Sequence, residues 1–144
     1  MVTVRETSGT MRGVAVSSLM MLALEPPSVA FALATSGSFQ EFLTQDAGFV
    51  VSILDREQEF ISERFAGRAP VPDADLSGIP FDLVTDGLPV LRGSLAWCRC
   101  RVSNRQTHGD HVLIVADILE GLAGIDSDDP LLSYEGQYRG LEMR

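Results

Sequence analysis

The sequence predicts a mainly β domain whose strands close into a barrel. Three observations support this prediction: about seven short segments have strand-like apolar patterns, only two short segments have helical patterns, and turn residues separate them. A closed barrel removes the edges that so many strands would otherwise expose. With 144 residues and 45% hydrophobic content, the chain is expected to form a single domain, residues 1–144, with its own apolar core.

The stretch 13–34 is expected to organise the other segments. Alternating valines and small residues over Gly13–Val16 fit a strand with one covered face, and the hydroxyls of Ser17-Ser18 follow where the apolar pattern breaks. Consecutive prolines at Pro26-Pro27 remove two backbone donors and predict an extended turn before a second strand. The expected unit is therefore strand, polar edge, rigid turn and strand. A first hairpin, turning at Ser8-Gly9-Thr10, is expected to lead into it.

A hydroxyl-rich loop precedes a short helix predicted over Phe39–Gln45. The loop contains Thr35, Ser36 and Ser38, and Ser38 has capping-box spacing to Glu41. Backbone N–H groups and the positive dipole end at such a helix start suit a phosphate group. A plain helix cap needs the same residues, so both interpretations stay open from this motif alone.

The middle of the chain predicts a buried strand followed by a helix. Gly48–Leu54 is apolar almost throughout, so it is expected in the middle of a sheet with both faces covered. Asp55 and Gln58 have capping-box spacing at the start of a helix over Arg56–Phe65, and Arg68–Gly78 has loop composition. Three side chains of this helix are expected to pack on one face: Phe60, Ile61 and Phe65.

The second half of the chain predicts further strands and a hairpin. Its histidines are expected at the hairpin tip, in His108-Gly109-Asp110-His111. The expected segments are strands over Phe81–Val84, Val90–Ser103 and His111–Leu119, a chain reversal over Asn104–Asp110, an acidic loop over Gly121–Asp129 and a final strand within Pro130–Leu141.

The cysteines and histidines are the candidate reactive or metal-binding groups of the sequence. Cys98 and Cys100 lie two apart in a strand-like run, so their side chains are expected on one face and poorly placed to bond each other, and at least one is expected to be buried as a small apolar group. Redox chemistry is the alternative interpretation. His108 and His111 lie three apart without a closed ligand set around them, so no metal site is expected.

Composition and missing motifs exclude several classes of function. A formal charge of −9 and a sequence pI near 4.5 oppose binding to nucleic acid or anionic membrane. No apolar run could span a bilayer and the first residues lack a secretory signal, so a cytoplasmic protein is expected. The glycine pattern of a nicotinamide-binding Rossmann unit and the serine motif of elbow-type hydrolases are both absent. Any catalysis is therefore expected to depend on a cofactor's chemistry.

Many weak motifs in a fixed order make the sequence similar to one family. The chain resembles the short-chain flavin reductases, which are the small reductase partners of two-component flavin monooxygenases. The resemblance runs over nearly the whole chain. It depends on these motifs, in order: Gly13…Val16-Ser-Ser18, Leu24-Glu-Pro-Pro27, the hydroxyl loop before a short helix, Gly48-Phe…Ile53-Leu54, Phe65-Ala66, Gly87-x-Pro89…Gly93-x-x-Ala-Trp-x-Cys100, Gly109-Asp-His111 and Pro130-Leu-Leu-x-Tyr134…Tyr138-Arg139.

The resemblance implies a fold, a cofactor and a reaction. The implied fold is an FMN-binding, Greek-key-like split β-barrel that binds FMN or FAD, usually as a homodimer with two flavin sites near the subunit contact. The implied reaction is hydride transfer from NADH or NADPH to flavin, with reduced flavin released to a separate oxygenase. Such a reaction needs orientation and exclusion of water rather than a protein acid–base pair. The alternatives are a flavin-binding barrel that does not oxidise NAD(P)H and a non-catalytic dimer without flavin.

The resemblance also implies roles for individual residues. Three are expected to line the flavin ring and its ribityl chain, partly through backbone groups: Val16, Ser17 and Ser18. Three are expected to hold the phosphate: Thr35, Ser36 and Ser38. His111 is expected either to contact the nicotinamide or the flavin, or to serve only the structure of the hairpin tip.

The sequence departs from the family pattern at a few positions. Relatives generally carry a helix before the position of Met1, so a short or late-starting member is expected. The loop 35–38 contains no Lys or Arg, so the helix dipole is expected to contribute more to phosphate binding. Ala15 and Ala116 stand where threonine and glycine are frequent.

Overall fold

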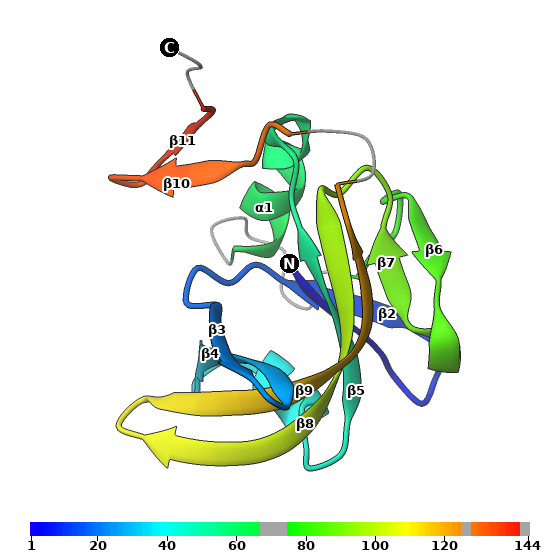
Figure 1. The fold of residues 1–144 in the computed structure, drawn as a ribbon, viewed down its shortest axis with the longest axis vertical. Helices are drawn as coiled ribbons and strands as arrows, with labels where there is room; N and C mark the ends of the chain where they lie inside the picture. Colours follow the sequence, from blue (N-terminus) through cyan, green and yellow to red (C-terminus); the bar gives the residue numbers. More distant parts are fainter. Residues whose placement is uncertain (67–74, 125–127, 142–144) are drawn as a thin grey trace.

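A computed structural model of the chain describes residues 1–66, 75–124 and 128–141. These residues are mainly β-strand, as expected, with one α-helix and three short 3-10 helices (Figure 1). The strands are β1 (Val2–Arg5), β2 (Met11–Val14), β3 (Met20–Leu24), β4 (Pro27–Ala34), β5 (Gly48–Ile53), β6 (Phe81–Leu83), β7 (Pro89–Leu91), β8 (Ala96–His108), β9 (His111–Ala123), β10 (Leu132–Tyr134) and β11 (Gln137–Arg139). The helices are η1 (Phe39–Phe42), η2 (Arg56–Gln58), α1 (Glu59–Phe65) and η3 (Thr85–Gly87).

A seven-stranded antiparallel sheet forms the body of the molecule, in the order β2-β1-β5-β8-β9-β4-β3. Figure 1 shows that the sheet curls on itself. The largest cluster of buried apolar side chains lies on the inner face of this curl. The remaining strands form two separate hairpins, β6–β7 and β10–β11. Within the described residues no ladder joins β2 to β3, so the barrel is split at this seam and two strand edges remain.

The core explains why β5 lies in the middle of the sheet. Phe49 and Val51 face the inside of the barrel, where Phe49 meets Phe31 of β4 edge to face with ring centroids 5.6 Å apart. Val50, on the opposite face, packs with Leu88 and Val90. Successive residues of a strand point to opposite faces, so β5 is covered on both sides, which confirms the prediction.

The predicted helix after β5 forms as η2 followed by α1. Asp55 accepts a hydrogen bond from the Glu57 backbone at 2.8 Å, and the Gln58 side chain accepts one from the Asp55 backbone at 2.9 Å, so the capping box is made. Ile61 and Phe65 are buried as expected. The prediction that Phe60 lies on this face was wrong, since its side chain is 57% exposed. The short helix buries only one face, which carries Ile61 and Phe65, four positions apart.

The long hairpin β8–β9 corrects three expected boundaries. The strand predicted over 90–103 is two strands, β7 and β8, separated by a turn in which Gly93 has φ of +79°. The chain reverses only at Gly109-Asp110, because β8 continues to His108. Strand β9 continues to Ala123, into the predicted loop over 121–129, of which 125–127 lie outside the described residues. Two register shifts, between Arg99 and Cys100 and between Val102 and Asn104, help these long strands to curl.

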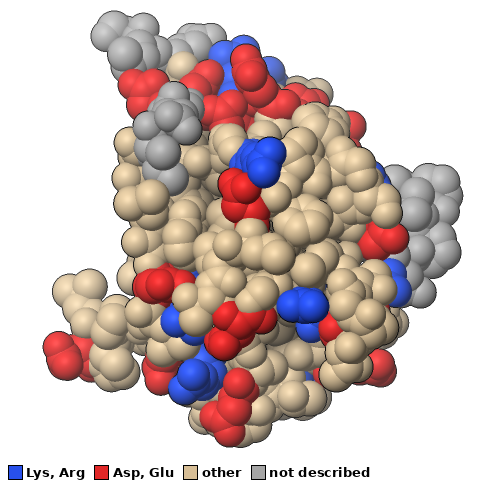
Figure 2. Space-filling view, turned by 90° about the vertical axis from the view of Figure 1, so that its right-hand side faces the viewer, with Lys and Arg blue, Asp and Glu red and all other residues tan. Residues whose placement is uncertain are grey.

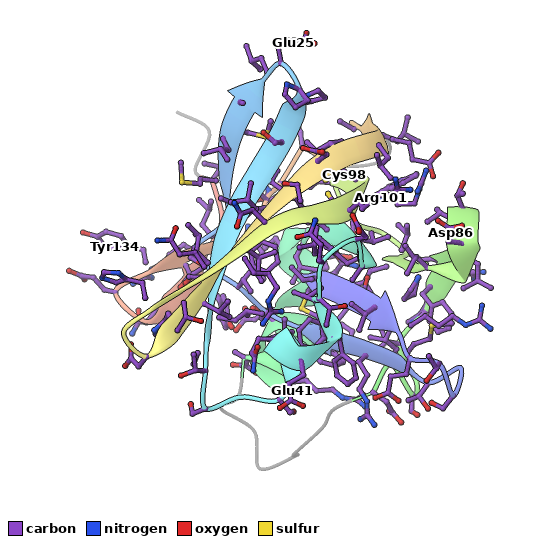
Figure 3. All side chains as sticks on the ribbon, turned by 90° about the horizontal axis from the view of Figure 1, so that it is seen from below. Glu25, Glu41, Asp86, Cys98, Arg101 and Tyr134 are labelled. Carbon is purple, nitrogen blue, oxygen red and sulfur yellow. The ribbon has the colours of Figure 1, made fainter. Side chains whose placement is uncertain are left out.

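Strand β3 was not predicted. The run Met20–Leu24 is apolar at every position, so it shows no alternation, yet it pairs with β4 along one edge. The predicted turn is present one residue earlier, at Glu25-Pro26, where the peptide bond is cis, and Pro27 is the first residue of β4, opposite Leu24. Figure 3 shows the β3–β4 hairpin projecting beyond the barrel, with Glu25 at its tip.

The two ends of the chain also form hairpins. The predicted first hairpin is β1–β2, closed by a turn in which Gly9 has φ of +90°. The predicted final strand is the hairpin β10–β11. Most of the predicted loop over 68–78 lies outside the described residues, but Leu76 at its end is buried and Asp75 forms an isolated bridge with Arg12.

Candidate functional site

A cavity of about 530 Å³ lies where five parts of the chain meet. Its walls come from Met1, the segment 15–19 after β2, the end of β5, the helix α1 with Ala66 after it, and the C-terminal hairpin. This volume lies in the range of small-molecule and cofactor sites. The cavity is therefore the first candidate for a ligand site.

The chemistry of the cavity is uncharged and rich in hydroxyl groups. All the described residues that line it have uncharged side chains. Residues with hydroxyl groups line it from different elements: Ser17, Ser62, Ser133 and Tyr138. The hydroxyl of Ser52, which also lines the cavity, is fully buried and accepts from the Leu91 backbone N–H at 3.4 Å. A wall of this kind can bind a neutral aromatic ring through apolar contact and hydrogen bonds without an opposing charge. The residues present therefore fit an isoalloxazine or nicotinamide ring.

A hydrogen bond between distant residues closes one side of the cavity. The Tyr138 hydroxyl donates to the Ser62 hydroxyl oxygen at 3.0 Å, and this bond joins β11 to α1. At the base of the hairpin, the Leu131 backbone donates to the Leu54 carbonyl at 3.0 Å, and Pro130 forms a bridge with Asp55. These contacts hold the C-terminal hairpin as a wall of the cavity.

Of the residues expected at the flavin ring, Val16 and Ser17 line the cavity and Ser18 does not. The Ser18 hydroxyl donates to the Ala32 carbonyl oxygen at 3.2 Å and accepts from the Ala32 backbone N–H at 2.9 Å. If the pairing of Met20 with Ala30 is continued toward the N-terminus, residue 18 lies opposite residue 32. The Ser18 hydroxyl therefore makes the two hydrogen bonds with Ala32 that a backbone partner would make in a continued strand. The Ser18 side chain therefore holds the segment in place.

The hydroxyl loop lies at the end of β4. Thr35 donates to the Asp110 carbonyl oxygen through its backbone N–H at 2.9 Å and through its hydroxyl at 3.1 Å. Ser36 and Ser38 are exposed. The predicted helix over 39–45 is wrong in length, because η1 is a 3-10 helix of four residues, and Ser38 makes no side-chain cap bond to it. Hydroxyl and backbone groups, rather than a long helix dipole, are what this loop offers to a phosphate.

His111 lies beside this loop rather than in the cavity. Ala34 pairs with His111 in the β4–β9 ladder, which brings the end of β4 to the hairpin tip. His111 Nδ1 lies 2.8 Å from Asp110 Oδ1, and this hydrogen bond lowers the pKa of the Asp110 carboxyl. The structure thus groups Thr35, Asp110 and His111 at one end of the sheet.

Strand β4 connects the two groups of predicted residues. Ser18 is hydrogen-bonded to Ala32 of β4. Thr35 lies three positions after Ala32, which corresponds to about 10 Å along an extended strand. The cavity residues Val16 and Ser17 immediately precede Ser18 in the chain. An extended ligand could therefore contact both groups along one edge of the sheet.

Arg105 was not predicted as a site residue. This side chain of β8 donates to the Gln40 carbonyl at 2.6 Å, to the Gln40 side-chain oxygen at 2.7 Å and to the Leu43 carbonyl. It thereby places a positive charge against η1, directly after a loop that has no basic residue of its own. Only the register of β8 reveals this contact, because Arg105 is 65 positions from Gln40. The cavity residues Ser52, Ser62 and Ser133 were also missed, since isolated serines carry no motif.

Three further observations concern metal ligands, membrane-spanning helices and surface charge. Among the described residues, no three His, Cys, Asp or Glu side chains gather as metal ligands would. No helix in the described ranges has the length and apolar character needed to cross a membrane. Figure 2 shows one face of the molecule, on which basic and acidic side chains are interspersed without a continuous basic area.

Comparisons with known proteins give one family. The family model for the flavin reductase like domain matches residues 1–142. The NADH-dependent flavin reductase StyB of Pseudomonas fluorescens is 32% identical over 94% of this chain and 77% of its own length. The reductase subunit HsaB of a flavin-dependent monooxygenase from Mycobacterium tuberculosis is 33% identical over 90% of this chain and 68% of its own length.

A solved structure agrees with the sequence comparison. The styrene monooxygenase flavin reductase from Pseudomonas putida S12 is 30% identical, covers 99% of this chain and 89% of its own chain, and superimposes with a TM-score of 0.83. The curled sheet and the cavity with uncharged, hydroxyl-bearing side chains are thus found in a chain that matches this family over residues 1–142. On these grounds the protein belongs to the flavin reductase like domain family.

Proposed function

We propose that this protein is an NAD(P)H-dependent flavin reductase that supplies reduced FMN or FAD to a separate oxygenase. The observation that carries the proposal is the uncharged cavity beside Ser17, connected along β4 to the hydroxyl loop. The family relationship supports it, since StyB is named an NADH-dependent flavin reductase and HsaB a monooxygenase reductase subunit. Such an enzyme needs two ring systems held together, and no acid–base pair.

We assign the binding roles as follows. Val16 and Ser17 contact the flavin ring from the cavity wall, and Ser18 contacts the ligand only through its backbone, since its hydroxyl bonds to Ala32. Ser36 and Ser38 hold the phosphate through their hydroxyls, and Thr35, whose hydroxyl and backbone N–H both donate to the Asp110 carbonyl, positions the loop. His111 contacts the nicotinamide side from the hairpin tip. When bound, the flavin supplies the hydride acceptor, and the chain's own residues bind, orient and exclude water.

A homodimer is part of the proposal. Strand β3 is an edge strand of the sheet, and its large side chains are exposed on both faces, with Met21 at 59% and Leu24 at 86%. An apolar edge on a projecting hairpin is a liability in a monomer, and a second copy of the chain would cover it. We further propose that the whole chain, residues 1–144, acts as a single domain and that the protein is cytoplasmic, where its nicotinamide co-substrate is found.

Steady-state oxidation of NADH and NADPH, measured with increasing FMN or FAD, tests the proposed reaction. The expected result is a rate that saturates with flavin concentration. Tight flavin binding without turnover would instead indicate a flavin-storage protein of the same fold. Flavin fluorescence measures the binding of each flavin. If neither FMN nor FAD binds, the protein would be a dimer without redox function.

The dimer has a separate test. Light scattering after size exclusion is expected to give twice the chain mass for the unaltered protein and a single chain mass for Met21→Asp. A matched change at an exposed position elsewhere, Leu83→Asp on β6, is expected to leave the dimer intact. A monomeric unaltered protein would contradict this part of the proposal.

A further inference from the structure

The two cysteines of the chain form a close pair on β8. Cys98 is partly buried and Cys100 fully buried, and both are free thiols. Their sulfur atoms lie 3.6 Å apart, which is direct contact. The expectation that both side chains share one face is confirmed, but they are much closer than that expectation allowed.

The curl of the sheet explains this contact. Both side chains face the core cluster inside the barrel, which is the concave face of the sheet, and there side chains two apart along a strand converge. A register shift opposite Arg99 and Cys100 increases the local twist. Two steps along a strand separate the Cα atoms by about 6.6 Å, which lies within the range that disulfide bonds span.

The two thiols differ in their electrostatic surroundings. The hydrogen bond from the Cys100 thiol lowers the pKa of Cys98, because it stabilises the Cys98 thiolate. The same hydrogen bond, together with burial, raises the pKa of Cys100. Cys98 is also the more exposed of the two. The Cys98 sulfur is therefore suited to attack an oxidant as a thiolate, and the Cys100 sulfur beside it remains a protonated thiol.

The pair packs against the same core cluster as part of the segment that lines the ligand cavity. Cys98, Val16 and Leu19 are all partly buried and pack against the same core cluster. Cys98 pairs with Val51 on one side and Gly121 on the other, so no bulky cross-strand neighbour lies beside it on β9. Figure 3 places Cys98 on β8.

We propose that Cys98 and Cys100 are a redox-active dithiol, which hydrogen peroxide converts reversibly into an intramolecular disulfide. In the first step the Cys98 thiolate attacks peroxide, an S–O bond forms, the O–O bond breaks and hydroxide leaves, which gives Cys98 sulfenic acid. In the second step Cys100 attacks that sulfur, the S–S bond forms and the sulfenic oxygen leaves as water with the Cys100 proton. The hydroxide of the first step takes up the proton that Cys98 released, so the two sulfurs lose two electrons and the peroxide is reduced to two molecules of water.

The inference that the protein's own activity supplies the hydrogen peroxide rests on the proposed function. Reduced flavin that is released and meets dioxygen before it reaches an oxygenase yields hydrogen peroxide. A flavin reductase without its partner would thus expose its own dithiol to peroxide. The dithiol chemistry itself requires only peroxide, so the two claims can be tested apart.

The chain offers a sharp measurement of the disulfide. Trypsin cleaves after Arg99, between the two cysteines, so their peptides separate unless a disulfide joins them. The reduced protein is treated with hydrogen peroxide, alkylated, digested and analysed by mass spectrometry without reductant. The expected result is a joined peptide pair, an intact mass lower by two hydrogens and full reversal by dithiothreitol. A non-reducing gel is expected to show no cross-linked chains.

Two variants separate the roles of the sulfurs. Cys98→Ser is expected to lose the reaction completely and keep a free Cys100, and Cys100→Ser is expected to accumulate Cys98 sulfenic acid that dimedone traps. Two free thiols in the unaltered protein after peroxide treatment, or a disulfide between chains, would overturn the proposal, and this result does not depend on how the variants fold. A parallel sample receives NADH, flavin and air, with or without catalase. If NADH is not consumed there, the proposed function fails, and the added-peroxide sample alone decides the dithiol.

Discussion

Arg105 holds the 3-10 helix η1 through Gln40. Its guanidinium donates to the Gln40 backbone carbonyl at 2.6 Å and to the Gln40 side-chain oxygen at 2.7 Å, and it also reaches the Leu43 carbonyl. Strand β8 thereby fixes the segment that follows the hydroxyl loop, and it brings a positive charge to a part of the chain that otherwise has none. The position of the proposed phosphate site depends on this contact.

We expect Arg105→Ala to weaken flavin binding and lower stability together. Loss of hydrogen bonds from a charged group costs about 2 kcal/mol of unfolding free energy, and the released loop should raise the flavin dissociation constant several-fold. Urea unfolding and flavin fluorescence titration measure the two effects. Arg101→Ala, at an exposed arginine of the same strand, is the matched control and should change neither. Unchanged flavin affinity in Arg105→Ala would separate Arg105 from the ligand site.

Neighbouring serines should respond differently to the loss of their hydroxyls. Ser18→Ala removes both hydrogen bonds to Ala32 and is expected to cost about 1 kcal/mol of stability. Ser17→Ala is expected to stay within about 0.5 kcal/mol of the unaltered protein and to weaken flavin binding instead. Thermal unfolding and flavin titration of both variants compare the two roles. The opposite assignment of effects would show that Ser18, and not Ser17, contacts the ligand.

Gly121 is expected to tolerate no side chain. A Cβ atom there would lie 2.7 Å from the Trp97 carbonyl oxygen and 3.2 Å from Cys98 Cβ, both on the neighbouring strand. Because backbone atoms cannot move aside cheaply, Gly121→Ala should destabilise the fold by about 1–3 kcal/mol. Gly37→Ala, whose Cβ would meet only Ala34 O at 3.6 Å, is the matched control. Equal unfolding midpoints for the two variants would contradict the tight packing of β8 on β9.

An ion pair on β8–β9 predicts a pH-dependent stability. The hydrogen bond from Arg99, whose side chain is only 13% exposed, holds the pKa of Glu120 below its usual 4.5. Because the pKa is lower in the folded chain, the stabilisation is present above that usual value and is lost as the pH falls through the folded-state pKa. Glu120→Gln should therefore lower the melting temperature at neutral pH. The difference from the unaltered protein should shrink in acid, and a difference independent of pH would refute this account.

Local patterns predicted much of the fold. The capping residues Asp55 and Gln58, the buried strand β5 and the prolines of the β3–β4 turn each act through neighbours in the chain, so the sequence alone predicts them. Strand β3 was missed because a uniformly apolar edge strand has no alternation to detect. The end of β8 was placed too early because its last residues are polar and resemble a loop.

The site was predictable only in part. Ser17 and the hydroxyl loop stand out because their hydroxyls interrupt apolar segments. Ser62 and Tyr138 come together only when the C-terminal hairpin packs on α1, and Arg105 meets Gln40 only through the register of β8. The contact of Cys98 with Cys100 depends on the curl of the sheet, which no spacing rule for a flat strand includes.

The most direct test of the central claim is anaerobic mixing of the protein with oxidised flavin and NADH or NADPH. We expect the visible absorbance of oxidised flavin to disappear with one flavin reduced per nicotinamide oxidised, much faster than in the absence of protein. Ser17→Ala is expected to require a higher flavin concentration for the same rate. If neither FMN nor FAD is reduced faster with the protein than without it, with either nicotinamide, the account is wrong.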